Sequence, residues 1–327
     1  MKDIVNNIFS VEDHEFSGLA LRIFQFQYHS NTVYKTWVDT LGIDPSTIKS
    51  INEIPYLPVS FFKSHEVVAT ALPAEQIFTS SGTSQSITSK HIVTDLSIYE
   101  QSFYKGFEHF YGPVTDWCII GLLPSYLERQ GSSLVYMVDH LIKASHCEDS
   151  GFYLYNFEKL ALLIKQQEAR KQKTMIIGVT FALLDFAQAY PMHLQYTTIV
   201  ETGGMKGRKR EMIREEVHQV LKENFELKNI HSEYGMTELL SQAYSKGNGI
   251  FNTVPWMKVF TRDEDDPLQL HDAGKGLLNI IDLANINSCS FIATDDVALI
   301  YEDNSFEVMG RMDASDVRGC SLLAVPS

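Results

Sequence analysis

Short apolar runs alternate with helical patterns through the middle of this chain. The runs WCIIGLL (117–123), MIIGV (175–179) and TTIVET (197–202) have the length and composition of buried strands. Segments of helical pattern lie among these runs, at residues 131–144, at residues 156–173 and in a stretch ending at Ala189. Strands that alternate with helices form sheets covered by helices on both faces. The sequence therefore predicts an α/β fold of layered sheets flanked by helices.

The two ends of the chain have different patterns. Residues 17–42 have a mostly helical spacing of apolar side chains that ends at Gly42, which predicts a helical N-terminal layer. Two prolines in residues 54–68 favour an extended approach to the sheet. Residues 95–111 predict a helix with an aromatic stripe, whose role is core packing or lining a fatty-acid tunnel. Beyond Gly249 the pattern is strand-like and predicts a small β-rich subdomain.

Composition limits the classes of partner. The 327 residues are 44% hydrophobic, enough for a large core. A formal net charge of −14 opposes nucleic-acid binding by bulk electrostatics. The N-terminus has no apolar signal core, and no run of about 18 uncharged apolar residues occurs. We therefore expect a cytoplasmic protein without a membrane span, whose partners are small molecules and proteins.

A hydroxyl-rich loop, FTSSGTSQSITSKHIV (78–93), has the character of a phosphate-binding segment. Gly82 allows a tight turn in which consecutive N–H groups point at an anion, and Lys90 adds a positive charge. Hydroxyl donors come from Ser80, Ser81, Thr83 and Ser84. No Walker A motif is present, and the alternative is a Ser/Thr-rich surface loop.

The segment HSEYGMTE (231–238) contains the most informative acid of the chain. Glu238 could bind Mg²⁺ while the metal bridges phosphate oxygens. The alternative is an acid at a helix N-terminus, because Thr237 and Glu238 are expected to enter a helix. His231 could approach a substrate carboxylate or acyl phosphate, although a core or surface histidine is an equal interpretation.

Four motifs in this order resemble the adenylate-forming superfamily of acyl-CoA synthetases, peptide-synthetase adenylation domains and luciferase. SSGT (80–83) is similar to its phosphate loop, YGMTE (234–238) to its Tyr-Gly-x-Thr-Glu motif, and Thr294–Asp295 to its Thr-Gly-Asp motif. Gly310–Arg311 with Asp313 is similar to its hinge. The phosphate loop lacks the usual Thr-Thr-Gly-x-Pro-Lys ending, and RGCSLL lies near the C-terminus. Within the superfamily the chain most resembles LuxE-type acyl-protein synthetases.

The resemblance implies a site for ATP and Mg²⁺. Tyr234 would flank the adenine, Thr237 would bind the α-phosphate, and Asp295 would bind the ribose hydroxyls, with Asp296 as the alternative. Arg311 would reach ribose or phosphate. The expected ATP-binding residues are Ser80, Ser81, Gly82, Thr83, Ser84, Gly203, Gly204, Tyr234, Gly235, Thr237, Asp295 and Arg311. Glu238 is the expected metal ligand, and Lys90, Glu238, His231 and Cys320 are the expected catalytic residues.

The resemblance also implies a domain plan. Residues 1–312 would form the adenylation domain, with 250–312 as the β-rich subdomain and 313–327 as a short tail. Because so few residues follow Asp313, we expect the mobile C-terminal domain of larger synthetases and its lysine to be absent. Lys90, or a lysine from a partner chain, would then stabilise the transferring phosphate.

A cysteine near the C-terminus is the expected acyl acceptor. LuxE-type proteins carry such a cysteine, and Cys320 with nearby Arg318 fits it; the alternative is a small packed residue. Cys118, Cys147 and Cys289 show no CxxC spacing, so reduced thiols are expected and metal binding by cysteine is not.

The implied reaction activates a carboxylic acid, expected to be a fatty acid, as acyl-AMP and then passes the acyl group to a thiol. The acceptor would be the enzyme's own cysteine and then a partner acyl reductase. Two alternatives stay open. One is an acyl- or aryl-CoA ligase, with CoA as final acceptor. The other is an inactive acyl-nucleotide-binding subunit that acts as a scaffold for a reductase.

Overall fold

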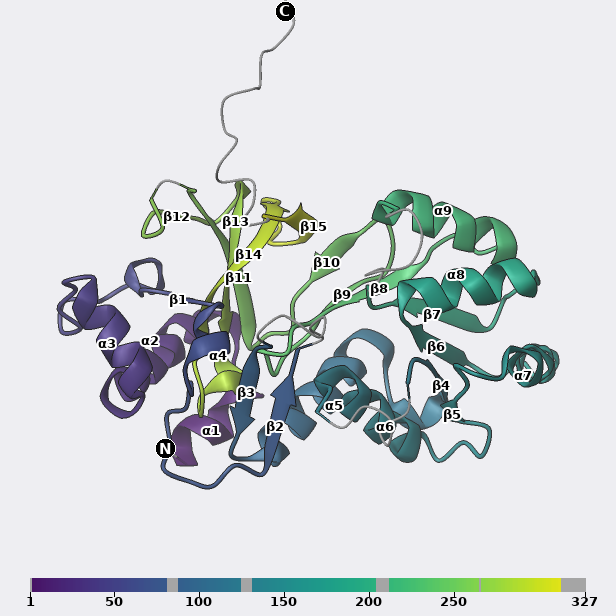
Figure 1. Ribbon diagram of the computed structural model, residues 1–327, viewed down its shortest axis with the longest axis horizontal. Helices are drawn as coiled ribbons and strands as arrows, with labels where there is room; N and C mark the ends of the chain where they lie inside the picture. The colour runs from purple at the N-terminus through teal and green to yellow at the C-terminus, as the bar shows by residue number, and fades with distance from the viewer. Residues whose placement is uncertain (1, 81–87, 125–130, 204–211, 265, 313–327) are drawn as a thin grey trace, which may run out of the picture.

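The computed structural model describes residues 2–80, 88–124, 131–203, 212–264 and 266–312. Within these ranges the chain forms one long mixed sheet with helices packed along it, and a separate two-stranded hairpin (Figure 1). The helices are α1 (Lys2–Ile8), α2 (Asp13–Ser30), α3 (Thr32–Thr40), α4 (Phe61–Ser64), α5 (Leu96–Tyr111), α6 (Ser133–Ser145), α7 (Phe157–Ala169), α8 (Thr180–Ala189) and α9 (Arg214–Phe225), with 3-10 turns η1 (Ile51–Glu53), η2 (Val114–Asp116) and η3 (Leu283–Asn285).

The strands of the main sheet are β1 (Leu57–Pro58), β4 (Cys118–Leu122), β5 (Gly151–Phe152), β6 (Thr174–Gly178), β7 (Thr197–Glu201), β8 (His231–Tyr234), β9 (Ala243–Ser245), β10 (Ile250–Asn252), β11 (Met257–Arg262), β12 (Leu270–His271), β13 (Gly274–Asp282), β14 (Phe291–Ile300) and β15 (Phe306–Arg311). The hairpin consists of β2 (Gln76–Thr79) and β3 (Lys90–Val93), which pair antiparallel.

The main sheet changes from parallel to antiparallel at β8. Its strands follow the order β12-β11-β13-β14-β15-β10-β9-β8-β7-β6-β4-β5, with β1 parallel to β14. Strands β5, β4, β6, β7 and β8 are parallel. Each neighbouring pair from β8 to β12 is antiparallel. The carboxyl end of β8 therefore lies where the two parts of the sheet meet, a position at which α/β sheets commonly bind ligands.

The parallel strands are buried on both faces. Along β4, Cys118, Ile120 and Leu122 pack in the core formed with α7, α8 and α9, whereas Ile119 packs in the larger core that includes α5 and α6. Such two-sided burial explains why these strands appear in the sequence as continuous apolar runs. The predicted α/β fold, with sheets flanked by helices, is confirmed.

Helix α5 begins and ends as its sequence predicts. Asp95 is the N-cap and its Oδ1 accepts a hydrogen bond of 3.0 Å from the backbone N–H of Ser97. The helix ends before Gly112, whose φ of 78° few other residues adopt readily. Tyr99, Phe103 and Phe107 are almost completely buried in the larger core. The aromatic stripe is therefore used for packing.

The predicted N-terminal helical layer consists of two helices that meet at Asn31. Its Oδ1 caps α3 by accepting from Tyr34 N at 3.0 Å, and its Nδ2 donates to Ser288 O at 2.9 Å. The chain then enters the sheet in extended form at β1, beside β14, as the prolines indicate. In Figure 1 this layer lies beside the antiparallel strands, on the opposite side of the molecule from α7, α8 and α9.

Residues beyond Gly249 form β10 to β15, which continue the main sheet through the pairing of β10 with β9. The treatment of residues 250–312 as a subdomain, and the boundary at Asp313, stay predictions. Across the part of the chain that the structure describes, no helix is both long enough and apolar enough to cross a membrane.

Candidate active site

The turn that follows β8 is held by two buried polar side chains from distant parts of the chain. Asn285 Nδ2 in η3 donates to the carbonyl of Glu238 at 2.7 Å. His91 of β3 lies between Asn285 and the turn, with Nδ1 2.8 Å from Thr237 O and Nε2 3.0 Å from Asn285 Oδ1. Burial lowers the pKa of His91 to about 4, so the ring is neutral at neutral pH. These contacts fix the backbone of the YGMTE segment.

Glu238 is a buried carboxyl group, and its neighbours offset only part of the cost of burying its negative charge. The residue is 6% exposed, and burial raises its pKa. A hydrogen bond from the Ser89 side chain opposes this rise, as do the positive charges of Arg311 and Lys63. Oxygen ligands suit Mg²⁺, which proteins often hold through a single carboxylate plus phosphate oxygens and water. The surroundings of Glu238 fit such an ion.

The hydroxyl-rich loop begins beside Glu238. Ser80 N donates to Ser89 O at 3.1 Å, and Ser89 N donates to Ser80 Oγ at 2.9 Å. This reciprocal pair closes the base of the loop, and Ser89 also contacts Glu238. The predicted residues Ser81, Gly82, Thr83, Ser84, Gly204 and Cys320 lie outside the described residues, as do Asp313 and Arg318.

Two neighbouring carboxylates of β14 face Arg311 of β15. Asp295 Oδ2 lies 3.9 Å from Arg311 Nη2, and Asp296 Oδ1 lies 3.7 Å from Arg311 Nε. Tyr234 donates from its hydroxyl to Asp296 Oδ2 at 2.7 Å. The Asp295 side chain is 49% exposed and that of Asp296 is 13% exposed. The structure therefore brings Tyr234, Asp295 and Arg311 together. Among the described residues, Asp296 accepts a hydrogen bond from the Tyr234 hydroxyl, whereas the Asp295 side chain has no such hydrogen bond.

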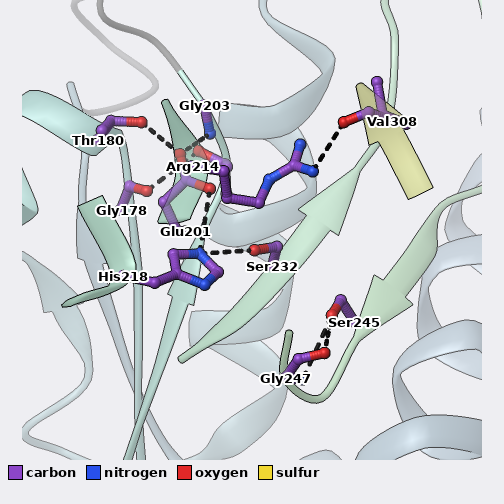
Figure 2. Close-up of polar contacts among 11 residues, drawn as sticks. Gly178, Thr180, Glu201, Gly203, Arg214, His218, Ser232, Ser245, Gly247 and Val308 are labelled. Carbon is purple, nitrogen blue, oxygen red and sulfur yellow. Dashed lines mark hydrogen bonds and ion pairs between the residues drawn. The ribbon is translucent and has the colours of Figure 1, made fainter. Parts of the chain in front are cut away.

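A buried acid holds the turn after β7 (Figure 2). Glu201 Oε1 accepts hydrogen bonds from the Thr180 hydroxyl and from Gly203 N, the latter at 2.7 Å. His218 Nε2 lies 4.0 Å from Glu201 Oε2 and 3.2 Å from Ser232 Oγ. Burial lowers the pKa of His218, while Glu201 opposes that shift. Glu201 thus positions Gly203, a predicted ATP-binding residue.

Two further predicted catalytic residues, Lys90 and His231, lie on β3 and β8. Lys90 is exposed on β3, where it pairs with Thr79. His231 stacks on Tyr111, with Nδ1 3.3 Å from the Tyr111 hydroxyl. Burial, followed by the charge of Lys246, lowers the pKa of His231 to about 4. His231 is therefore uncharged at neutral pH and offers a neutral ring rather than a cation.

The helix expected after Tyr234 is not formed. Thr237 and Glu238 lie in a turn, and the chain continues to β9. Asp282, which is completely buried, accepts from Leu240 N at 2.8 Å and from Ser241 N at 3.0 Å. These bonds hold the backbone N–H groups in a non-helical path. The alternative of Glu238 as a helix N-terminal acid is therefore wrong.

Sequence reasoning missed several residues of the site. Ser89, His91 and Asn285 support Glu238 and its turn, and Lys63 contributes charge from α4. Glu233 is a half-buried acid on β8. Only Glu233, an acid within a strand beside YGMTE, had a local signal in the sequence. The others act across long sequence separations.

A family model for acyl-protein synthetases, LuxE, matches residues 9–325. The chain belongs to the LuxE acyl-protein synthetase family. It is 24% identical over 337 residues to the long-chain-fatty-acid–luciferin-component ligase of Aliivibrio fischeri, covering 93% of this chain and 86% of the relative. The corresponding ligase of Vibrio harveyi is 23% identical over 335 residues, covering 94% and 86%. The predicted family and the predicted enzyme class, acyl-protein synthetase, are confirmed.

Solved structures agree with the fold of this LuxE family member. An open conformation of 2-hydroxyisobutyryl-CoA ligase matches with a TM-score of 0.64 at 12% identity, over 94% of this chain and 78% of that one. ATP-bound MatB of Rhodopseudomonas palustris matches with a TM-score of 0.55 at 14% identity, over 75% and 49%. The chain therefore has the fold of adenylate-forming ligases.

Proposed function

We propose that this LuxE family member activates a long-chain fatty acid as acyl-AMP, with ATP as co-substrate, and then transfers the acyl group to a thiol. The observation that carries the proposal is the buried Glu238, held by Ser89 at the base of the hydroxyl-rich loop. The long-chain-fatty-acid ligases of Aliivibrio fischeri and Vibrio harveyi support the choice of acid.

The nucleoside of ATP would bind between the last residue of β8, the middle of β14 and the last residue of β15. Asp295 has carboxylate oxygens available for the two ribose hydroxyls, and Arg311 lies beside it for ribose or phosphate. Tyr234 and Gly235 would flank the adenine, together with Gly203, which Glu201 holds in place. The hydroxyl-rich loop and Thr237 would contact the phosphates. A solved structure with ATP bound, that of MatB, supports this use of the fold.

In the first half-reaction one oxygen of the fatty-acid carboxylate attacks the α-phosphorus of ATP. The bond from that phosphorus to the bridging oxygen breaks, and pyrophosphate leaves with the electron pair. A Mg²⁺ ion bound by Glu238 would neutralise charge on the phosphate oxygens. The related fold of O-succinylbenzoate coenzyme A synthetase of Bacillus subtilis, solved with ATP and magnesium, supports that choice of ion. The chain's own residues chiefly position the reactants and stabilise developing charge.

Positive charge near the transferring phosphate would come from this domain's own lysines or from a partner chain. Lys90 is the residue predicted from the sequence. Lys63 is a second source, because its charge favours ionised Glu238 from the neighbouring helix α4. Both side chains are exposed, so either can reorient when ATP binds.

In the second half-reaction we propose Cys320 as the nucleophile. Its thiolate would attack the acyl carbon of acyl-AMP, forming a thioester and releasing AMP. A partner acyl reductase would then take the acyl group. The acyl-protein synthetase family supports an acyl-protein product. Cytoplasmic location also stays a prediction.

The product of transfer tests this function. The protein would be incubated with ATP, Mg²⁺ and labelled hexadecanoate, and acyl-AMP and hydroxylamine-sensitive acyl-protein would be measured after quenching. We expect both products, and we expect Cys320→Ser to keep acyl-AMP and lose the acyl-protein. Label retained on Cys118, Cys147 or Cys289 would contradict the choice of Cys320. Acyl-CoA formed on addition of CoA would favour a CoA ligase, and the absence of acyl-AMP would favour a scaffold.

A further inference from the structure

Glu233 is an acid that the reaction described above does not use. It lies on β8, one residue before Tyr234, and pairs in register with Tyr244 of β9. Its side chain lies against Gly235, because a methyl group placed on Gly235 would collide with Glu233 Oε1. The carboxyl group therefore lies beside Gly235 of the YGMTE segment.

Three tyrosines lie near Glu233, and the hydroxyl of each contacts another group. A charge on Glu233 raises the pKa of Tyr99, Tyr111 and Tyr244, after the larger effect of burial, which shows that all three lie near it. The Tyr99 hydroxyl donates to Ser133 O at 2.9 Å, and the Tyr244 hydroxyl contacts Met137 Sδ at 4.0 Å. The Tyr111 hydroxyl lies 3.3 Å from His231 Nδ1.

No described residue forms a hydrogen bond or ion pair with the Glu233 carboxyl. A half-buried carboxyl group without a partner in the protein can complete its hydrogen bonding with water or with a ligand. The side chain is only partly exposed. It therefore borders space that a small polar group can enter.

The surroundings favour the neutral form of this acid. Burial raises the pKa of Glu233 to about 8, and the negative charge of Glu201 on β7 adds to the rise. Glu201 is the one charge in the described part of the chain that acts on Glu233 in this way. The nearby His231 is neutral, and Lys246 lies over the Tyr111 ring rather than at the carboxyl. Glu233 therefore holds an O–H donor at neutral pH.

We propose that protonated Glu233 donates a hydrogen bond to the carboxylate of the fatty acid and positions it for attack on ATP. This role rests on the proposed adenylation and adds a residue that holds the acid. One carboxylate oxygen accepts the Glu233 hydrogen, and the other attacks the α-phosphorus. The proton stays on Glu233 throughout, so its charge does not change during the step.

The proposal explains why an acid suits a site for an anionic substrate. A charged Glu233 would repel the incoming carboxylate, whereas a neutral one supplies a donor in surroundings where the tyrosine hydroxyls are already engaged. A long alkyl chain is compatible with the aromatic rings around it. The direction of the pH effect follows from the raised pKa of Glu233. The hydrogen bond to the fatty acid is present while Glu233 is protonated, so the affinity for the fatty acid falls as the pH rises through about 8.

The test is ATP–pyrophosphate exchange with hexadecanoate, measured from acid to alkaline pH for the wild type, Glu233→Gln and Glu233→Leu. Gln keeps a neutral donor at every pH, and Leu removes it. The matched control is Glu108→Gln, which removes an exposed acid from α5. The KM values for hexadecanoate and ATP are determined separately, and circular dichroism verifies folding.

We expect Glu233→Leu to raise the KM for hexadecanoate by about tenfold, the effect of one hydrogen bond, while the KM for ATP changes by less than about twofold. The wild type should lose kcat/KM for hexadecanoate above about pH 8. Glu233→Gln should retain binding and lose that alkaline decline, and Glu108→Gln should match the wild type. An unchanged alkaline decline in Glu233→Gln, or an unchanged KM for hexadecanoate in folded Glu233→Leu, would overturn the role of Glu233 alone. Absence of exchange in the wild type would instead contradict adenylation itself and this role with it.

Discussion

Asn285 donates a hydrogen bond of 2.7 Å from Nδ2 to the carbonyl of Glu238. The two residues are 47 positions apart, and both are buried. Glu238 contributes its side chain to the proposed metal site and its carbonyl to this bond. The position of the carboxyl group therefore depends on η3, an element without any motif of its own.

Replacing Asn285 tests this dependence. Asn285→Ala leaves the Glu238 carbonyl and one nitrogen of His91 without their partners, so we expect a loss of about 1–3 kcal/mol in unfolding free energy. Adenylation should also fall, because the turn is less well held. Urea unfolding and exchange assays measure the two effects. Asn287→Ala is the matched control, since its Oδ1 has no hydrogen-bond partner among the described residues. Equal stability of the two variants would contradict the account.

Replacing Glu238 separates stability from activity. Burial raises the Glu238 pKa, so its ionised form is penalised in the folded state. The wild type should lose unfolding free energy relative to Glu238→Gln as pH rises above about 4.5, where the unfolded-state acid ionises. In acid the two proteins should be similarly stable. Urea unfolding at a series of pH values, without ATP or metal, measures the difference in unfolding free energy between the two proteins. If Glu238→Gln loses unfolding free energy relative to wild type as the pH rises from acid to neutral, the prediction is wrong.

The two carboxylates of β14 give a paired prediction about ATP. Asp295 is half-exposed, and among the described residues its side chain forms an ion pair only with Arg311. Asp295→Ala should therefore leave folding intact and raise the KM for ATP by about tenfold. Asp296→Asn should disturb Tyr234, to which Asp296 is bonded at 2.7 Å. Exchange kinetics at varied ATP give both constants. If Asp295→Ala leaves the KM for ATP unchanged while Asp296→Asn raises it, the ribose ligand is Asp296.

The lysines give a third comparison. Because Lys63 rather than Lys90 acts on the charge of Glu238, Lys63→Gln should lower kcat for exchange by about tenfold or more, and Lys90→Gln should have the smaller effect. Both side chains are exposed, so neither change should lower the midpoint of thermal unfolding appreciably. A larger loss of kcat in Lys90→Gln than in Lys63→Gln would favour Lys90, the lysine predicted from the sequence, as the source of positive charge.

The parts of this structure that were predictable depend on local sequence. The buried runs at β4, β6 and β7 and the Asp95 cap of α5 follow from neighbouring residues. The role assigned to Glu238 from the YGMTE motif stays a prediction. The helix expected to include Thr237 and Glu238 does not form, because Asp282, about 40 residues away, accepts hydrogen bonds from the N–H groups of Leu240 and Ser241. Local propensity carries no information on such a bond.

The supporting residues of the site were unpredictable for the same reason. Ser89 reaches Glu238 and His91 reaches Thr237 across more than a hundred residues, and only the folded sheet brings them together. The raised pKa of Glu233 likewise depends on burial and on Glu201 of a neighbouring strand. A single sequence shows that these residues are polar and leaves their partners open.

Exchange of labelled pyrophosphate into ATP tests the central claim most directly, since it reports reversible formation of acyl-AMP and needs no acyl acceptor. The assay compares wild type and Glu238→Gln with Mg²⁺ and octanoate, dodecanoate or hexadecanoate, and without acid. We predict exchange that requires a fatty acid and falls by about a hundredfold or more in folded Glu238→Gln. No fatty-acid-dependent exchange by the folded wild type, or full exchange by Glu238→Gln at limiting Mg²⁺, would contradict the account.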